Sequence, residues 1–225
     1  MPQTDADTIR RGAAVFMFGA AATAVSGLLI QTVVQPSTDV SDKMWRYPWS
    51  DSGTFIAVSL LYIVFHLLVV VGLAAFGRSG AAGTSRTGRV GIRLAVVGTM
   101  LLAAGEVASL PIRDASVHDT SAAVVGAAFG LGVLVSAIGL LTTGSATLSA
   151  RRWEDWRRFT PLAAGLWTTV LLGINMTKAL PSGVAIYGLC LLAMAIALYS
   201  DPLPGAASDS SSGGVPDFEA RLQSP

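Results

Sequence analysis

Four polar side chains lie inside long apolar stretches of this 225-residue sequence, where a polar group needs partners. Glu106 and His66 are ionisable, and Gln31 and Asn175 are amides expected at a depth comparable to that of Glu106. Because removal from water disfavours a carboxylate, Glu106 must be protonated or paired. Such a group suits the binding of a proton or a cation near the mouth of a cavity. The alternative is a neutral or paired carboxyl that holds helices together.

The two histidines do not suit a haem or a metal site. A membrane b-type haem usually has two axial histidines, but His118 is predicted in a loop, about 18 Å from the depth of His66. Glu106 and His66 differ in depth by about 9 Å on the same scale, which weighs against a shared metal. We therefore predict no metal site, no cofactor and a hydrogen-bonded role between helices for His66.

No catalytic motif accompanies these residues. The sequence has no H-E-x-x-H, no G-x-S-x-G, no Walker lysine loop and no G-x-G-x-x-G. The single cysteine, Cys190, excludes a disulfide within one chain. A net charge of +1 gives no reason to expect nucleic acid as a partner. We predict no catalytic residue, and enzymatic activity is the least favoured class of function.

The elements that position the polar residues are predicted to be membrane-spanning helices. The chain is 52% hydrophobic and only 13% charged, with a mean hydropathy of +0.60, whereas soluble domains are about 25% charged. Runs of about 20 apolar residues cross the hydrocarbon core as helices. We predict an all-α integral membrane bundle of six transmembrane helices, with spans at about 12–34, 54–76, 90–112, 120–142, 161–179 and 182–199.

The distribution of basic residues predicts the orientation. Most Lys and Arg residues fall on one side of the predicted spans, which is typical of the cytoplasmic side. An even number of spans then places both termini in the cytoplasm of a bacterial cell. The apolar run continues through Val34, which favours an uncleaved first helix over a signal peptide. We expect a cytoplasmic segment at 1–11, one transmembrane domain at 12–199 and a disordered cytoplasmic tail at 200–225.

Aromatic residues gather at the predicted membrane borders. Trp45, Tyr47 and Trp49 belong to the outer loop 35–53, and Trp153 and Trp156 lie on the inner side. Amphipathic rings prefer the headgroup region, so the favoured interpretation is a set of interfacial anchors. The inner pair alternates with four basic residues suited to an anionic inner leaflet: Arg151, Arg152, Arg157 and Arg158.

A second interpretation applies to the outer loop. A loop of this length exceeds what a turn between two helices needs, and long structured loops are often functional. In that case the loop is a partly folded cap over a cavity, with Asp39, Asp42 or Arg46 meeting a polar ligand.

Small residues occur at spacings typical of helix packing. Gly126 and Gly130 form a G-x-x-x-G pattern in the fourth predicted span, followed along the same span by Gly132, Ser136 and Gly139. Gly98 and Gly105 mark the third predicted span. In lipid, such residues allow close approach of two backbones. We favour packing inside the bundle over a dimer face, and we expect Gly130→Leu to disrupt folding or association if packing is their role.

The segments VVQPSTDVSDKMWRYPWS and RRWEDWRRFTPLAAGLW together resemble small multi-span membrane proteins of actinobacteria that carry no assigned activity. The resemblance implies a multi-helix plasma-membrane fold over roughly 12–199. The leading functional hypothesis is a small transporter or ion-coupled carrier with its polar site around Glu106. The alternatives are a structural or regulatory protein packed against a membrane-protein partner or a second copy, and, last, a membrane enzyme or redox protein.

Overall fold

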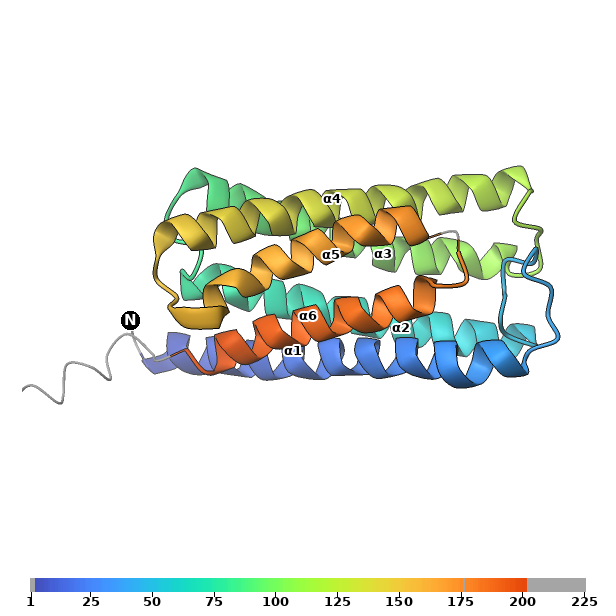
Figure 1. Ribbon diagram of the computed structural model, residues 1–225, viewed down its shortest axis with the longest axis horizontal. Helices are drawn as coiled ribbons and strands as arrows, with labels where there is room; N and C mark the ends of the chain where they lie inside the picture. Colours follow the sequence, from blue (N-terminus) through green and yellow to red (C-terminus); the bar gives the residue numbers. More distant parts are fainter. Residues whose placement is uncertain (1–2, 176, 202–225) are drawn as a thin grey trace, which may run out of the picture.

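The computed structural model describes residues 3–175 and 177–201, and within these ranges it contains helices and no strand. The predicted all-helical class is confirmed (Figure 1). The six α-helices are α1 (Gln3–Leu29), α2 (Ser52–Ser79), α3 (Arg86–Ser109), α4 (Thr120–Ala150), α5 (Thr160–Ile174) and α6 (Leu180–Tyr199). The predicted tail, apart from its first two residues, lies outside the described residues.

Short helical segments extend the long helices. A π-helical segment, Ile30–Val34, and a 3-10 turn, Gln35–Ser37, continue α1. A 3-10 turn, Leu110–Ile112, continues α3, and another, Asp155–Phe159, leads into α5. These extensions bring the ends of α1 and α3 to the same end of the bundle as the loop between α1 and α2.

Local sequence signals fix several helix ends. The Asp51 side chain accepts a hydrogen bond from the Thr54 amide, and Ser85 caps α3 through the Gly88 amide. Gly80 ends α2 with a φ of 72°, a left-handed conformation that glycine adopts without strain. Pro161 lies in the first turn of α5, where its missing N–H costs no hydrogen bond.

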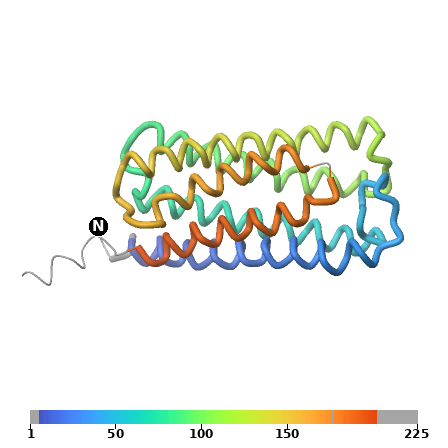
Figure 2. Tube along the Cα trace, in the orientation of Figure 1, coloured from blue at the N-terminus to red at the C-terminus, as the bar shows by residue number. Residues whose placement is uncertain are grey.

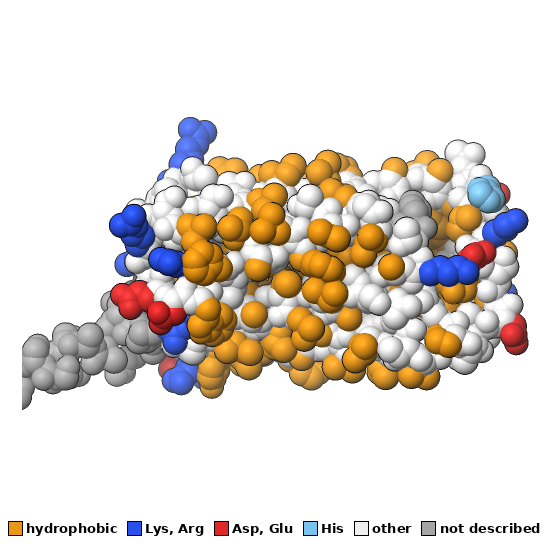
Figure 3. All heavy atoms as spheres, in the orientation of Figure 1, with side chains coloured by type: hydrophobic (Ala, Val, Ile, Leu, Met, Phe, Trp, Pro, Cys, Tyr) orange, Lys and Arg blue, Asp and Glu red, His pale blue; other side chains and the backbone are white. Residues whose placement is uncertain are grey.

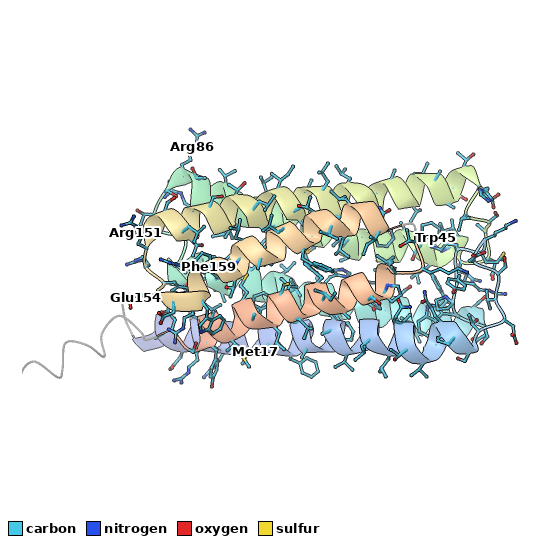
Figure 4. The ribbon with its side chains drawn as sticks, viewed as in Figure 1. Met17, Trp45, Arg86, Arg151, Glu154 and Phe159 are labelled. Carbon is cyan, nitrogen blue, oxygen red and sulfur yellow. The ribbon has the colours of Figure 1, made fainter. Side chains whose placement is uncertain are left out.

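The helices form a closed ring in which each helix packs on its neighbours in sequence. The last helix, α6, also packs along α1 and closes the ring (Figures 1 and 2). One end of the bundle carries residues 38–51, which we call the cap, and the loop 113–119; we call this end the cap end. The opposite end, which carries both Arg86 and Arg151, is the arginine end (Figure 4).

Helices α3 and α4 approach each other most closely through small residues. An added Cβ at Gly139 would lie 2.7 Å from Ala95 Cα, and one at Gly91 would lie 2.7 Å from the Thr143 amide. By contrast, an added Cβ at Gly130 would have no atom within 4 Å. Of the small residues expected to pack inside the bundle, Gly98, Gly132, Ser136 and Gly139 lie in the contact between α3 and α4, whereas the expectation is wrong for Gly130, which lies off that face.

The arginine end is densely packed. Trp153 is only 2% exposed, its ring lies 5.3 Å from that of Phe76, and its indole N–H donates to Asp201 at 2.9 Å. The prediction of Trp153 as an interfacial anchor must be corrected, since its ring lies inside the bundle. Trp156 is 51% exposed, as an interfacial residue would be.

The surface of the bundle is suited to lipid. Large hydrophobic side chains are exposed on all six helices, and charged side chains gather at the two ends (Figure 3). Examples, one from each helix in order, are Phe18, Leu60, Val107, Val124, Leu166 and Leu189. Among the described residues, five helices are long and apolar enough to cross a membrane, which is compatible with an integral membrane protein in contact with lipid.

The fifth predicted span is shorter than expected. It was predicted over 161–179, but α5 ends at Ile174 and a turn follows in which the Thr177 amide bonds to the Ile174 carbonyl. Its 15 residues extend for about 22 Å, less than the ~30 Å of a hydrocarbon core. The other helices begin before their predicted starts, except that α4 begins as predicted and continues beyond its predicted end to Ala150.

Candidate ligand-binding cavity

A cavity of about 550 Å³ lies at the cap end of the bundle. Its walls come from the extended end of α1, the cap, the outer turns of α2 and α3, α4, and the connection between α5 and α6. The residues that line it include Gln35, Asp42, Trp45, Tyr47, Trp49, Phe55, Ser59, Tyr62, Glu106, Phe129, Asn175 and Lys178. The cavity therefore draws residues from widely separated parts of the chain.

The cap is held over the cavity by backbone hydrogen bonds to the loop 113–119. The Trp45 amide donates to the Ala115 carbonyl at 3.0 Å, and the Arg46 amide donates to Arg113 at 3.1 Å. In return, the Val117 amide donates to the Lys43 carbonyl at 2.8 Å. These bonds give the cap a fixed place, as the second interpretation of the loop requires.

Ion pairs reinforce the same arrangement. The Arg46 guanidinium lies 3.0 Å from Asp114, whose carboxylate also accepts a hydrogen bond from the Ser52 hydroxyl at 3.0 Å. Lys178, in the connection between α5 and α6, pairs with Asp42 of the cap at 3.1 Å. The cap is thus tied to the loops on both of its sides.

Glu106 lies on the wall of the cavity, about 9 Å along α3 from the end of its extension at Ile112. Ser59 lies near the start of α2 and Glu106 near the end of α3, and both of these helix ends are at the cap end of the bundle. The Ser59 hydroxyl interacts with the Glu106 carboxyl. Among the described residues that line the cavity, Glu106 is the only charged side chain outside an ion pair.

One face of α2 carries a row of polar and aromatic residues toward the middle of the bundle. Ser59 and Tyr62 line the cavity, and the Tyr62 hydroxyl accepts a hydrogen bond from Ser26 at 3.1 Å. His66 follows one turn deeper, with its ring 6.4 Å from that of Tyr62. Its buried Nδ1 has no hydrogen-bond partner among the described residues, so the predicted interhelical hydrogen bond is not made by that atom.

The structure brings together some of the predicted candidates and separates others. Glu106, Asn175 and Asp42 line the cavity. Gln31 lies behind the wall, where its amide donates to the Gln35 side chain at 2.9 Å. Asp39 is exposed outside the cavity.

Arg46 and His66 also lie apart from the cavity wall. The Arg46 guanidinium is directed to Asp114 in the ion pair that fastens the cap. His66 is placed below the cavity rather than in its wall. Within the described part of the chain, no group of three His, Cys, Asp or Glu residues is placed to hold a metal ion.

The aromatic residues of the cap face inward. Trp45, Tyr47 and Trp49 all line the cavity and are only partly exposed. Figure 4 shows Trp45 at the end of the bundle opposite Arg151. These rings therefore contribute to the cavity wall, which is more than interfacial anchoring demands.

Several lining residues escaped the sequence analysis, chiefly Gln35, Ser59, Tyr62 and Phe129. A signal for two of them was present, because Ser59, Tyr62 and His66 recur at the spacing of one helical face. Hydroxyl and aromatic residues are ordinary inside apolar helices, so only their convergence on Glu106 in space distinguishes them.

No protein-family model, curated protein or solved structure matches this chain. The class of protein is therefore defined by the fold and the cavity: a helical membrane protein with a capped, partly polar cavity between its helices.

Proposed function

We propose that the chain is a small carrier of a bacterial cell membrane, with Glu106 as the ion-coupling group of a solute-binding site in the cavity. The single observation that carries this proposal is the position of Glu106 on the cavity wall, without an ion-pair partner among the described residues. The interaction with Ser59 of α2 would also suit a carboxyl that joins helices, but such a carboxyl has no need to line a cavity. A carboxyl on a cavity wall meets what enters the cavity.

The proposed topology has six spans, both termini in the cytoplasm and one transmembrane domain over 12–199. The cap end then faces outward, and the arginine end meets the anionic inner leaflet through Arg151, Arg152, Arg157 and Arg158. In this arrangement α5 crosses most of the bilayer, and the turn after Ile174 completes the crossing beside the cavity. Non-helical backbone at membrane depth is tolerated where it lines a cavity.

The distribution of packing supports an outward-facing state. The cavity occupies the cap end, whereas side chains such as Phe16, Phe76, Trp153 and Leu198 fill the arginine end. A carrier exposes its site to one side at a time, so one closed end is expected in each state. The π-helical segment at Ile30–Val34 lies beside the cavity, and such segments are frequent at functional sites.

A structural or regulatory membrane protein is the second candidate. The observation that favours it is the open space at Gly130, where a partner helix or a second copy of the chain would meet α4. In that case Glu106→Gln would leave the function of the assembly unchanged. A membrane enzyme or redox protein stays the least favoured class.

The experiment uses a cysteine at Ser59 in a protein whose native Cys190 is replaced by Ala. A membrane-impermeant maleimide is applied to right-side-out and to inside-out vesicles. A carrier alternates its access, so we expect Ser59→Cys to react in both preparations. Reaction in right-side-out vesicles alone would contradict the carrier while retaining the site, and no reaction in either would contradict the site.

Two control variants calibrate this result. Ser41→Cys, in the exposed part of the cap, should react only in right-side-out vesicles, and the opposite result would contradict the orientation. Ser136→Cys, which is fully buried in the face of α4 that packs on α3, should react in neither preparation.

A further inference from the structure

We propose that the cavity binds an organic cation with an apolar or aromatic body, such as a quaternary ammonium compound, held by aromatic rings and by Glu106. This inference deepens the proposed function, because it names the chemical class of the solute at the same site. It rests on the aromatic lining of the cavity, its charge and its size.

Aromatic rings surround the cavity from several elements. Trp45, Tyr47 and Trp49 come from the cap, and further rings come from α2 and α4: Phe55, Tyr62 and Phe129. The negative face of an aromatic ring attracts a cation, most strongly for Trp, and the attraction increases where water is excluded. Several rings around one cavity are the arrangement that recognises quaternary ammonium groups.

Two of the rings lie close to Glu106. Phe129 packs against Gly105, the residue before Glu106, with its ring carbons 3.0–3.1 Å from the position of an added Cβ. Tyr62 is near enough to Glu106 for an electrostatic interaction between the two groups. The rings and the carboxyl therefore act on the same part of the cavity.

The charge of the cavity favours a cation over an anion. Three charged side chains line it, and two of them, Asp42 and Lys178, pair with each other at 3.1 Å. The third, Glu106, leaves one negative charge when it is ionised. The nearby cations Arg46 and Arg113 belong to the cap and its loop, where both contact Asp114.

The size of the cavity suits an organic solute better than a bare metal ion. A volume of about 550 Å³ lies within the range of roughly 300–1,000 Å³ that is typical of small-molecule sites. The described residues also place no cluster of three metal ligands around it. The uncharged polar groups of Gln35 and Asn175 remain on the wall to orient the body of the ligand.

The test measures binding of phenyltrimethylammonium to the full-length protein in detergent by isothermal titration calorimetry. Its uncharged counterpart N,N-dimethylaniline and the anion benzenesulfonate serve as comparison ligands. We expect the cation to bind at least about tenfold more tightly than either, which corresponds to about 1.4 kcal/mol. No binding of the cation, or equal binding of the neutral amine, would overturn the proposal.

Variants test whether Glu106 and the aromatic rings are responsible for the binding of phenyltrimethylammonium. Glu106→Gln should weaken binding of phenyltrimethylammonium about tenfold, whereas Glu106→Asp, which keeps the charge, should stay within about threefold. Trp49→Leu should weaken it about fivefold, and Trp156→Leu, at the arginine end, should leave it unchanged. Undiminished binding in Glu106→Gln, with an unchanged unfolding temperature as evidence of folding, would overturn the role of the carboxyl.

Binding of phenyltrimethylammonium and labelling of Ser59→Cys test the ligand class and the carrier function separately. Two-sided reactivity of Ser59→Cys without binding of phenyltrimethylammonium would retain the carrier and reject the cation. Binding of the cation together with one-sided reactivity would retain the ligand class and reject the carrier.

Discussion

Replacing Gly139 on α4 by Ala tests the packing of α3 against α4. The added Cβ would lie closest to the Ala95 amide nitrogen, then 2.7 Å from Ala95 Cα and 2.8 Å from the Gly91 carbonyl oxygen, whereas ordinary contacts begin at 3.4 Å. All three atoms belong to the backbone of α3, so no flexible side chain can yield. The two helices would have to separate by roughly 1 Å, which removes up to about half of the dispersion energy at neighbouring contacts.

The expected cost follows from this separation. Overpacking of a well-packed interior typically costs 1–3 kcal/mol, and we expect Gly139→Ala to destabilise the bundle by about 2 kcal/mol. Gly130→Ala on the same helix is the matched control. With no atom within 4 Å of its added Cβ, it should be neutral, or stabilising by up to about 1 kcal/mol through helix propensity.

Thermal unfolding in detergent, followed by tryptophan fluorescence, measures both variants under identical conditions. The unfolding temperature should fall for Gly139→Ala and hold or rise for Gly130→Ala. Equal losses in the two variants, or a neutral Gly139→Ala, would refute the assignment of the α3–α4 contact.

Three further perturbations address the cap and the helix ends. Asp114→Asn removes the ion pair with Arg46, so amide hydrogen exchange in the cap should accelerate while exchange in α4 stays constant. Hydrogen bonds from Thr54 lower the pKa of Asp51, so its stabilising charge is present at neutral pH and is lost as the pH falls through that pKa. The difference in unfolding temperature between wild type and Asp51→Asn should therefore shrink in acid, and a constant difference would contradict this. Trp153→Phe removes the hydrogen bond to Asp201 and should cost about 1 kcal/mol, measured by thermal unfolding.

The helical architecture could be predicted from the sequence because it depends on local patterns. Apolar runs of the right length predict the helices, because backbone groups in lipid must be satisfied within a helix. The end of α5 was misplaced because Asn175 and Thr177 are compatible with either a helix or a turn. Contacts in the folded bundle select between these two conformations.

The candidate site was predicted only in part. Glu106 was identifiable because a carboxyl inside an apolar run is costly wherever it points. The inward direction of Trp45, and the burial of Trp153, depend on contacts with residues far away in the sequence. An aromatic ring at a membrane border looks the same in sequence whether it meets lipid or another helix.

Gly130 shows the same limitation for packing. A G-x-x-x-G pattern identifies a smooth helix face, but it does not say which neighbour that face meets. In the structure, α3 packs on the face that contains Gly139 and Ser136, which were also among the small residues expected to pack, and Gly130 lies off that face. Which face of α4 meets α3 depends on the arrangement of the helices in the ring, and no local sequence pattern encodes that arrangement.

The proposed site requires that the side chain at position 106 face a cavity open to the outer side of the membrane, and Glu106→Cys tests this. The variant is made with Cys190→Ala and treated with a membrane-impermeant thiol reagent in intact cells. We predict that Glu106→Cys reacts, though more slowly than Ser41→Cys in the exposed cap. If it is as unreactive as the buried Ser136→Cys while Ser41→Cys is fully labelled, position 106 does not face an outward cavity and the account is wrong.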